Sequence, residues 1–193
     1  SFSPCGNWIT YTKAAKNDMS VVYAHNLKTG KEVAITEKWY NSSSPVFSTD
    51  GKYIIFTSAR DFNPTYGQLE WNHTYNNMNG VYMAMLAEDT PSPLLPTDGA
   101  VESPKAEGEV VVKIDTENLP GRIIKLPLAA GSYRNFFSDG KKVYYSAAGG
   151  TKAFDLKTQK EETVAEGASF SLTAGSKKAL FTKGRQLFVA DFP

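Results

Sequence analysis

Hydrophobic residues along the chain fall in short runs bounded by Gly, Asp, Asn and Ser, and no segment keeps a helical spacing of apolar positions over a dozen residues. Runs of this length that are rich in β-branched and aromatic residues are typical of strands. We predict strands at Trp8–Lys13, Val21–Leu27, Glu32–Thr36, Pro45–Ser48, Tyr53–Ser58, Val81–Leu86, Glu109–Asp115, Ile123–Leu126, Tyr133–Phe137, Lys142–Ser146, Lys152–Leu156, Glu162–Ala165, Ser169–Leu172, Ala179–Lys183 and Gln186–Asp191.

Two polar motifs recur between these runs. The first is a Gly-containing turn followed by a buried strand; it occupies 48–58 and returns at 138–146 and 173–182. The second is Asn-Leu-Lys-Thr-Gly at 26–30, which is matched by Asp-Leu-Lys-Thr-Gln at 155–159. Both are typical of hairpins. Because the two motifs alternate, the repeating unit is four antiparallel strands, which is a blade of a β-propeller.

The fold predicted is therefore all-β: a β-propeller fragment of about four radially arranged, antiparallel four-stranded blades. The blades span about 1–40, 44–122, 131–167 and 168–193. We expect the first blade to lack some or all of its first strand and the fourth to lack its last. The second is about twice as long as the usual ~40–50 residues of a blade. It therefore carries insertions, at 61–79 and at 96–108, and the second of these has the composition of a mobile surface loop.

Composition excludes several classes of function. Among 193 residues, 41% are hydrophobic and 21% charged, which is typical of a globular domain. Lys and Arg number 21 and Asp and Glu 20, so the net charge of +1 gives no support to a nucleic-acid or anionic-membrane binder. The apolar runs are too short to span a membrane. The single cysteine, Cys5, excludes an internal disulfide and a Cys-based zinc cluster, and we expect neither metal nor cofactor.

A catalytic site is not predicted within these residues. A hydrolytic triad needs a nucleophile, a base and an orienting acid, and His25 and His73 are the only imidazoles in the sequence. His25 lies in an alternating strand pattern, and no Gly-x-Ser-x-Gly motif is present.

The first insertion is the best candidate for a binding site. It brings together side chains that are common in protein contacts, and the candidates are Arg60, Tyr66, Glu70, Trp71 and His73. A purely structural role is the alternative, in which the aromatic side chains pack the loop onto its blade. The two interpretations are compatible, because a loop must be packed in order to present anything.

Parts of the sequence resemble a known family of β-propellers. The run 44–61, Ser-Pro-Val-Phe-Ser-Thr-Asp-Gly-Lys-Tyr-Ile-Ile-Phe-Thr-Ser-Ala-Arg-Asp, resembles the propeller repeat of TolB-like proteins and tricorn-type proteases. The segments 60–71, 81–94 and 112–133 are similar to the propeller of tricorn-like serine peptidases. The resemblance is strongest from about 44 to 135.

In that family the propellers precede a PDZ-like domain and a serine-protease core. The resemblance implies that the catalytic groups belong to the serine-protease core. None of the family's catalytic motifs occurs in this sequence. It implies a non-catalytic role in peptide access and sorting, or docking to the protease core. The partners would be peptides and the remaining domains of a longer parent peptidase, in the cytoplasm or periplasm. The alternative is a free-standing TolB-like propeller that serves as a protein-binding module.

The incomplete end blades suggest a further property. We expect apolar side chains to be exposed at both ends, and these are Trp8, Ile9 and Tyr11 on one side and Leu187, Phe188 and Val189 on the other. Exposed apolar faces and free strand edges promote association. We therefore predict self-association, with internal closure of the ring as the alternative.

Overall fold

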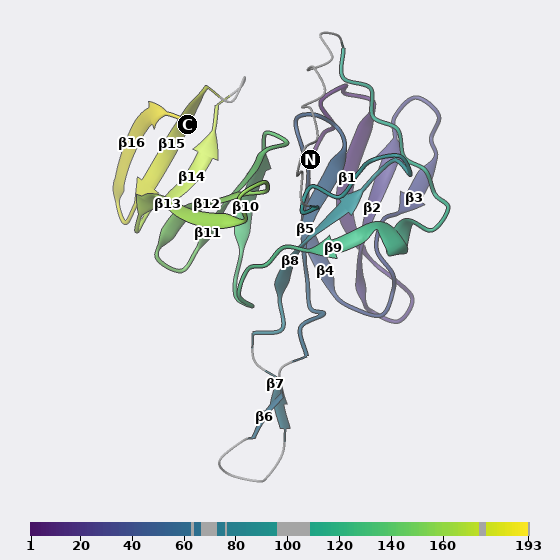
Figure 1. Cartoon of the computed structure of the whole chain (residues 1–193), viewed down its shortest axis with the longest axis horizontal. Helices are drawn as coiled ribbons and strands as arrows, with labels where there is room; N and C mark the ends of the chain where they lie inside the picture. The colour runs from purple at the N-terminus through teal and green to yellow at the C-terminus, as the bar shows by residue number, and fades with distance from the viewer. Residues whose placement is uncertain (63, 67–72, 76, 96–108, 174–176, 193) are drawn as a thin grey trace.

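The computed structural model describes the chain except residues 63, 67–72, 76, 96–108, 174–176 and 193 (Figure 1). Its strands form four antiparallel sheets in chain order and a separate two-stranded hairpin. The first sheet contains β1 (Trp8–Ala14), β2 (Ser20–Asn26) and β3 (Glu32–Ala34). The second contains β4 (Ser42–Phe47), β5 (Tyr53–Ser58), β8 (Gly80–Met85) and β9 (Ile123–Lys125). The third contains β10 (Arg134–Ser138), β11 (Lys142–Ala147), β12 (Gly150–Asp155) and β13 (Lys160–Glu166). The fourth contains β14 (Ser169–Leu172), β15 (Lys178–Lys183) and β16 (Gln186–Asp191).

Each sheet packs face to face on the next through its own hydrophobic core. Along β11, Val143 and Tyr145 enter the core shared with the second sheet, whereas Tyr144 enters the core shared with the fourth. This alternation follows from the strand period of two, which sends successive side chains to opposite faces. Four antiparallel sheets stacked in series, with three-stranded sheets at both ends, confirm the predicted propeller fragment.

Burial follows the position of each sheet in the series. All six residues of β5 and all six of β8 are buried, because the second sheet is covered on both faces. Every residue of β16, at the outer edge of the last sheet, is exposed.

The repeated sequence motifs form equivalent turns. The Asn26 side-chain oxygen accepts hydrogen bonds from the N–H groups of Lys28 and Thr29, both at 2.9 Å. Asp155 does the same for the two residues at the matching positions, at 3.0 and 2.7 Å. Gly30 and Gln159 then adopt positive φ, 73° and 55°. One local hydrogen-bond pattern therefore specifies a hairpin in two different sheets.

The strand predicted at Glu109–Asp115 is wrong. These residues form no strand, because β9 already occupies the edge of β8 where a further strand could pair. The side chains of Val112 and Ile114 instead pack into the core between the first and second sheets.

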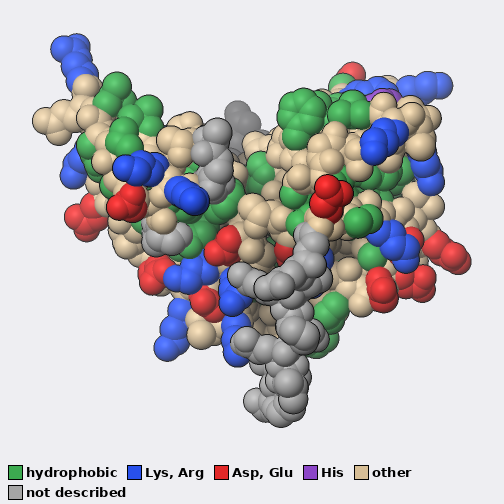
Figure 2. Space-filling model, turned by 90° about the horizontal axis from the view of Figure 1, so that it is seen from above, with side chains coloured by type: hydrophobic (Ala, Val, Ile, Leu, Met, Phe, Trp, Pro, Cys, Tyr) green, Lys and Arg blue, Asp and Glu red, His purple; other side chains and the backbone are tan. Residues whose placement is uncertain are grey.

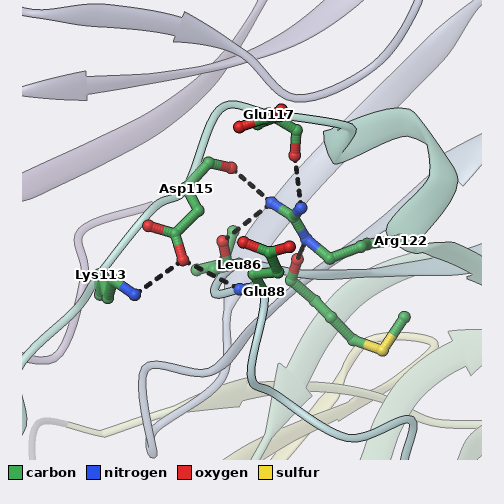
Figure 3. A network of polar contacts seen from close by, with 7 residues as sticks. Leu86, Glu88, Lys113, Asp115, Glu117 and Arg122 are labelled. Carbon is green, nitrogen blue, oxygen red and sulfur yellow. Dashed lines mark hydrogen bonds and ion pairs between the residues drawn. The ribbon is translucent and has the colours of Figure 1, made fainter.

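A buried arginine fastens this segment to β8 (Figure 3). The segment leads into a short 3₁₀ helix, η1 (Leu119–Arg122). From its end, Arg122 donates to the carbonyls of Met85 at 3.1 Å, Leu86 at 3.4 Å and Glu117 at 2.5 Å, and also to that of Asp115.

No described helix is long and apolar enough to cross a membrane.

The Asp115 carboxylate turns away from Arg122. It forms an ion pair with Lys113 at 2.9 Å and accepts the Glu88 N–H at 2.9 Å. The hydrogen bond from Lys113, followed by that from the Glu88 N–H, lowers the pKa of Asp115.

Residues 61–79 lie between β5 and β8. They contain a hairpin that the sequence pattern did not predict, formed by β6 (Pro64–Tyr66) and β7 (His73–Tyr75). Figure 1 shows this hairpin projecting away from the sheets. The segment 96–108, with its expected mobility, lies outside the described residues.

The two ends of the series differ in their exposed apolar residues. The expectation that Trp8 is exposed is wrong: only 8% of it is accessible, because it faces the core shared with the second sheet. Ile9 and Tyr11 point to the other face and are partly exposed. At the opposite end, Leu187 and Val189 are exposed as predicted, and Figure 2 shows hydrophobic side chains at this end of the molecule. Phe188 is also exposed, at 43%, although it stacks on Phe181 with ring centroids 5.5 Å apart.

Candidate functional site

One edge of the propeller, here called the insertion rim, gathers three connections of the first two sheets. Because antiparallel strands alternate in direction, the β1–β2 connection, the β3–β4 connection and the insertion between β5 and β8 all lie at this edge. The projecting β6–β7 hairpin marks the rim in Figure 1.

An apolar hollow of about 390 Å³ lies at the base of the insertion and is here called the Trp39 pocket. Its lining residues are Met19, Trp39, Tyr40, Asn41, Ala59, Phe62 and Met78. Trp39 is 78% exposed and Phe62 65% exposed, although large apolar side chains are usually covered. The pocket therefore presents hydrophobic surface to solvent between two neighbouring blades.

Hydrogen bonds join the walls of this pocket. The Asn41 side-chain oxygen accepts the Ser20 N–H at 2.9 Å, and the Asn41 carbonyl accepts the Ala59 N–H at 2.8 Å. The Met78 carbonyl accepts the N–H of Asp61 at 3.0 Å, which closes the base of the insertion. These hydrogen bonds between neighbouring connections therefore fix the shape of the pocket.

Arg60 stands behind the pocket wall. Its guanidinium carbon lies 5.4 Å from the ring centroids of both Tyr40 and Tyr82, and its Nε donates to the Ser58 hydroxyl at 3.1 Å. Cation–π contacts of this kind favour a fixed stack of the two rings and the guanidinium. One terminal nitrogen of Arg60 is buried and has no hydrogen-bond partner among the described residues.

Asp61 connects the base of the insertion to the outer strand of the same blade. Its Oδ1 pairs with Lys125 Nζ at 2.6 Å, while its Oδ2 is buried without a hydrogen-bond partner in the described part of the chain. Burial raises the pKa of the Tyr82 phenol, and the Asp61 carboxylate adds to the rise. The polar groups beneath the pocket thus hold its aromatic walls in place.

The predicted binding residues are distributed along the insertion. Arg60 lies at its base, next to the pocket. Tyr66 and His73 occupy paired positions across β6 and β7. Glu70 and Trp71 lie outside the described residues, so a contact role for these five positions stays a prediction.

Sequence reasoning missed much of the pocket, namely Met19, Trp39, Tyr40 and Met78. An aromatic pair, Trp39-Tyr40, between two predicted strands was the available signal. Within the described part of the chain, no three His, Cys, Asp or Glu side chains lie close enough together to hold a metal ion. The exposed Trp39 and Phe62 in the pocket lining suit this site to binding an apolar group.

Comparison with known proteins identifies a matching family and related proteins. The family described as the tricorn protease second beta propeller domain matches residues 1–193. The tricorn protease homolog 1 of Streptomyces coelicolor is 29% identical over 140 residues, which is 68% of this chain and 13% of that protein. The tricorn protease homolog of Saccharolobus solfataricus is 24% identical over 193 residues, which is 92% of this chain and 17% of that protein.

Solved structures agree on the fold. The crystal structure of the tricorn protease superposes with a TM-score of 0.75 and 16% identity, covering 99% of this chain and 22% of that one. TolB from Acinetobacter baumannii gives a TM-score of 0.58 and 16% identity, covering 98% of this chain and 39% of that one. The likeness to TolB at this identity shows a shared fold and nothing more. The chain spans less than a quarter of the length of the Streptomyces coelicolor and Saccharolobus solfataricus homologues.

Proposed function

The chain belongs to the family of the tricorn protease second beta propeller domain, and we propose that it serves a tricorn-like protease as a non-catalytic segment that contacts peptides at the insertion rim. The observation that carries this proposal is the Trp39 pocket, with its exposed Trp39 and Phe62.

The chemistry of the pocket favours an apolar side chain as its occupant. Burial of hydrophobic surface yields free energy in proportion to the area removed from water, and Trp39 has most of its surface left to bury. Methionine side chains adapt to different shapes, and the pocket has one at Met19 and one at Met78. This combination suits a site that accepts many peptides rather than one defined ligand.

The predicted residues of the insertion take two roles in this proposal. Arg60 acts as a positioning residue, because it holds Tyr40 in the pocket wall through the contact at 5.4 Å. Tyr66, Glu70, Trp71 and His73 contact other parts of the same peptide, outside the Trp39 pocket.

Docking to the protease core is the second candidate function. The apolar face at Leu187 and Val189 favours it, because this face has the character of a surface that another part of the parent protease covers. The free-standing TolB-like module has no comparable support, since the whole chain matches the tricorn propeller family.

Calorimetric titration with a short Leu- or Phe-containing peptide tests peptide contact. The Trp39→Ala variant is expected to bind at least about thirtyfold more weakly, because truncation of a Trp hot spot costs about 2 kcal/mol or more. Replacing the apolar residue of the peptide by Ser should cause a similar loss.

Phe2→Ala is the matched control, since Phe2 is 66% exposed and is not part of the pocket. Equal affinities for the wild type, Trp39→Ala and Phe2→Ala would contradict the proposal. Absence of peptide binding, together with binding of the parent protease core to the face at Leu187, would reject peptide contact and support docking as the function.

A further inference from the structure

A second hollow lies at the insertion rim, between the third and fourth sheets, and has a volume of about 450 Å³. It is here called the Arg134 pocket. Four segments meet there: the start of β10, the β11–β12 turn, the β13–β14 connection and the β15–β16 turn. It occupies the same position between neighbouring blades as the Trp39 pocket, but its lining has a different chemistry.

Backbone forms much of this pocket. Gly149, Gly150, Gly167 and Gly184 all line it and all have positive φ. At Gly150, where φ is 127°, an added Cβ would collide with the carbonyl oxygen of Ala165, so this position requires glycine. At Gly149 and Gly184 no heavy atom of the described residues, apart from the glycine and its chain neighbours, lies within 4 Å of an added Cβ, so a ligand can approach the backbone closely there.

The charged side chains at this pocket are positive, and the remaining polar side chains are neutral hydroxyl groups. Arg134 lines it, and its guanidinium has no hydrogen bond or ion pair with the residues described. The Lys183 side chain lies against Gly167, with Cε 3.4 Å and Nζ 3.9 Å from the position of a Cβ built on that glycine. Ser146, Ser169 and Thr182 add hydroxyl groups, and no lining residue is acidic.

We propose that the Arg134 pocket binds the C-terminal carboxylate of a peptide. Arginine pairs with carboxylates through two parallel N–H groups, and Lys183 adds a second positive charge. The hydroxyl groups can donate to the same carboxylate, while the bare backbone accommodates the last residues of the peptide.

The choice of a peptide carboxylate among anions rests on the proposed function, because that function brings peptides to this rim. An extended peptide could then have its end recognised in the Arg134 pocket independently of any apolar side chain held in the Trp39 pocket.

Triglycine tests the carboxylate separately from the apolar contact, since it has no side chain to occupy the Trp39 pocket. Titration of the ¹⁵N-labelled chain should shift the amide signals of Gly149, Gly150, Gly167 and Gly184. Triglycine with an amidated C-terminus should bind about five- to tenfold more weakly, as expected for the loss of charge-assisted hydrogen bonds.

Four variants make the test specific. Arg134→Gln and Lys183→Gln should each reduce the preference for the free acid over the amide. Arg185→Gln is the matched control, because Arg185 is an exposed cation in the same turn as Gly184 but does not line the pocket. Trp39→Ala should leave triglycine binding unchanged.

Equal binding of the acid and the amide would overturn the inference and leave peptide contact at Trp39 intact. Inorganic phosphate that shifts the same glycine signals at lower concentration than triglycine would overturn the assignment to a peptide carboxylate. Loss of apolar-peptide binding in Trp39→Ala, with the triglycine preference retained, would support both sites as separate.

Discussion

Arg122 donates its Nε–H to the carbonyl oxygen of Met85 at 3.1 Å, across 37 positions of sequence. This bond joins the end of β8 to the 3₁₀ helix that precedes β9, so that the connection of the second blade returns to its own sheet. The same guanidinium reaches three further carbonyls, and it is buried.

Arg122→Met should lower the free energy of unfolding by about 3 kcal/mol or more, because several buried carbonyls lose their donor together. Denaturation in urea measures the loss. Lys113→Ala, which removes a 63% exposed partner of Asp115, should cost less than about 1 kcal/mol. Similar losses in the two variants would contradict the central role assigned to Arg122.

The two described tryptophans should respond to substitution in opposite ways. Trp8→Ala should destabilise the fold by about 3–5 kcal/mol, because it leaves a cavity in the core between the first two sheets. Trp39→Ala should change stability by less than about 0.5 kcal/mol, because Trp39 is largely in solvent. Thermal and urea unfolding of the two variants measure both values. A large loss for Trp39→Ala would assign it a structural role.

Acid should weaken the turn at Asp155. The N–H of Thr158 is the main cause that lowers the pKa of this carboxyl, and the Thr158 hydroxyl and Lys157 N–H add to the effect. Because the folded pKa lies below the unfolded value of about 3.9, the ionised carboxylate stabilises the fold above that value, and this contribution is lost as the pH falls through the folded pKa.

Asp155→Asn should therefore be less stable than the wild type near neutral pH, with a difference that shrinks below about pH 4. The substitution preserves the turn, because Asn26 makes the equivalent hydrogen bonds in the first sheet. Urea midpoints measured over a pH series test this. A difference that stays constant down to about pH 2.5 would contradict it.

The uncovered face of the last sheet should cause association. Leu187 is 66% exposed and Val189 is 60% exposed, on a strand whose outer edge is unpaired within the described chain. We expect light scattering to give a mass that rises with concentration, and the double substitution Leu187→Lys and Val189→Lys to abolish the rise. A wild-type chain that stays monomeric at high micromolar concentration would contradict association through this face and favour internal closure of the ring.

Local turn chemistry made much of the fold predictable. Asp50 and Asp139 accept hydrogen bonds from the backbone two residues ahead, and Gly51 and Gly140 supply the positive φ between them. Such signals lie within a few residues, so they are visible in sequence. The segment 109–115 has the composition of a strand, but its pairing depended on whether the edge of β8 was free, which is a property of the assembled sheet.

The candidate site was less predictable, because its residues come from separate connections. Arg60 was found since it adjoins a long insertion, whereas Met19 and Trp39 lie in short connections of the first two blades. Only the packing of neighbouring sheets brings these segments together. In the same way, the packing of the third and fourth sheets places Arg134 in the lining of the second hollow and Lys183 against Gly167, which also lines it.

Photo-crosslinking tests peptide contact at the insertion rim most directly. A short apolar peptide with a benzophenone side chain would be irradiated with the chain, and the linked residues identified by mass spectrometry. We expect links at Trp39, Tyr40, Phe62 or Met78, which are lost when excess unlabelled apolar peptide is added. Links confined to the face at Leu187 and Val189, or no specific links, would contradict it.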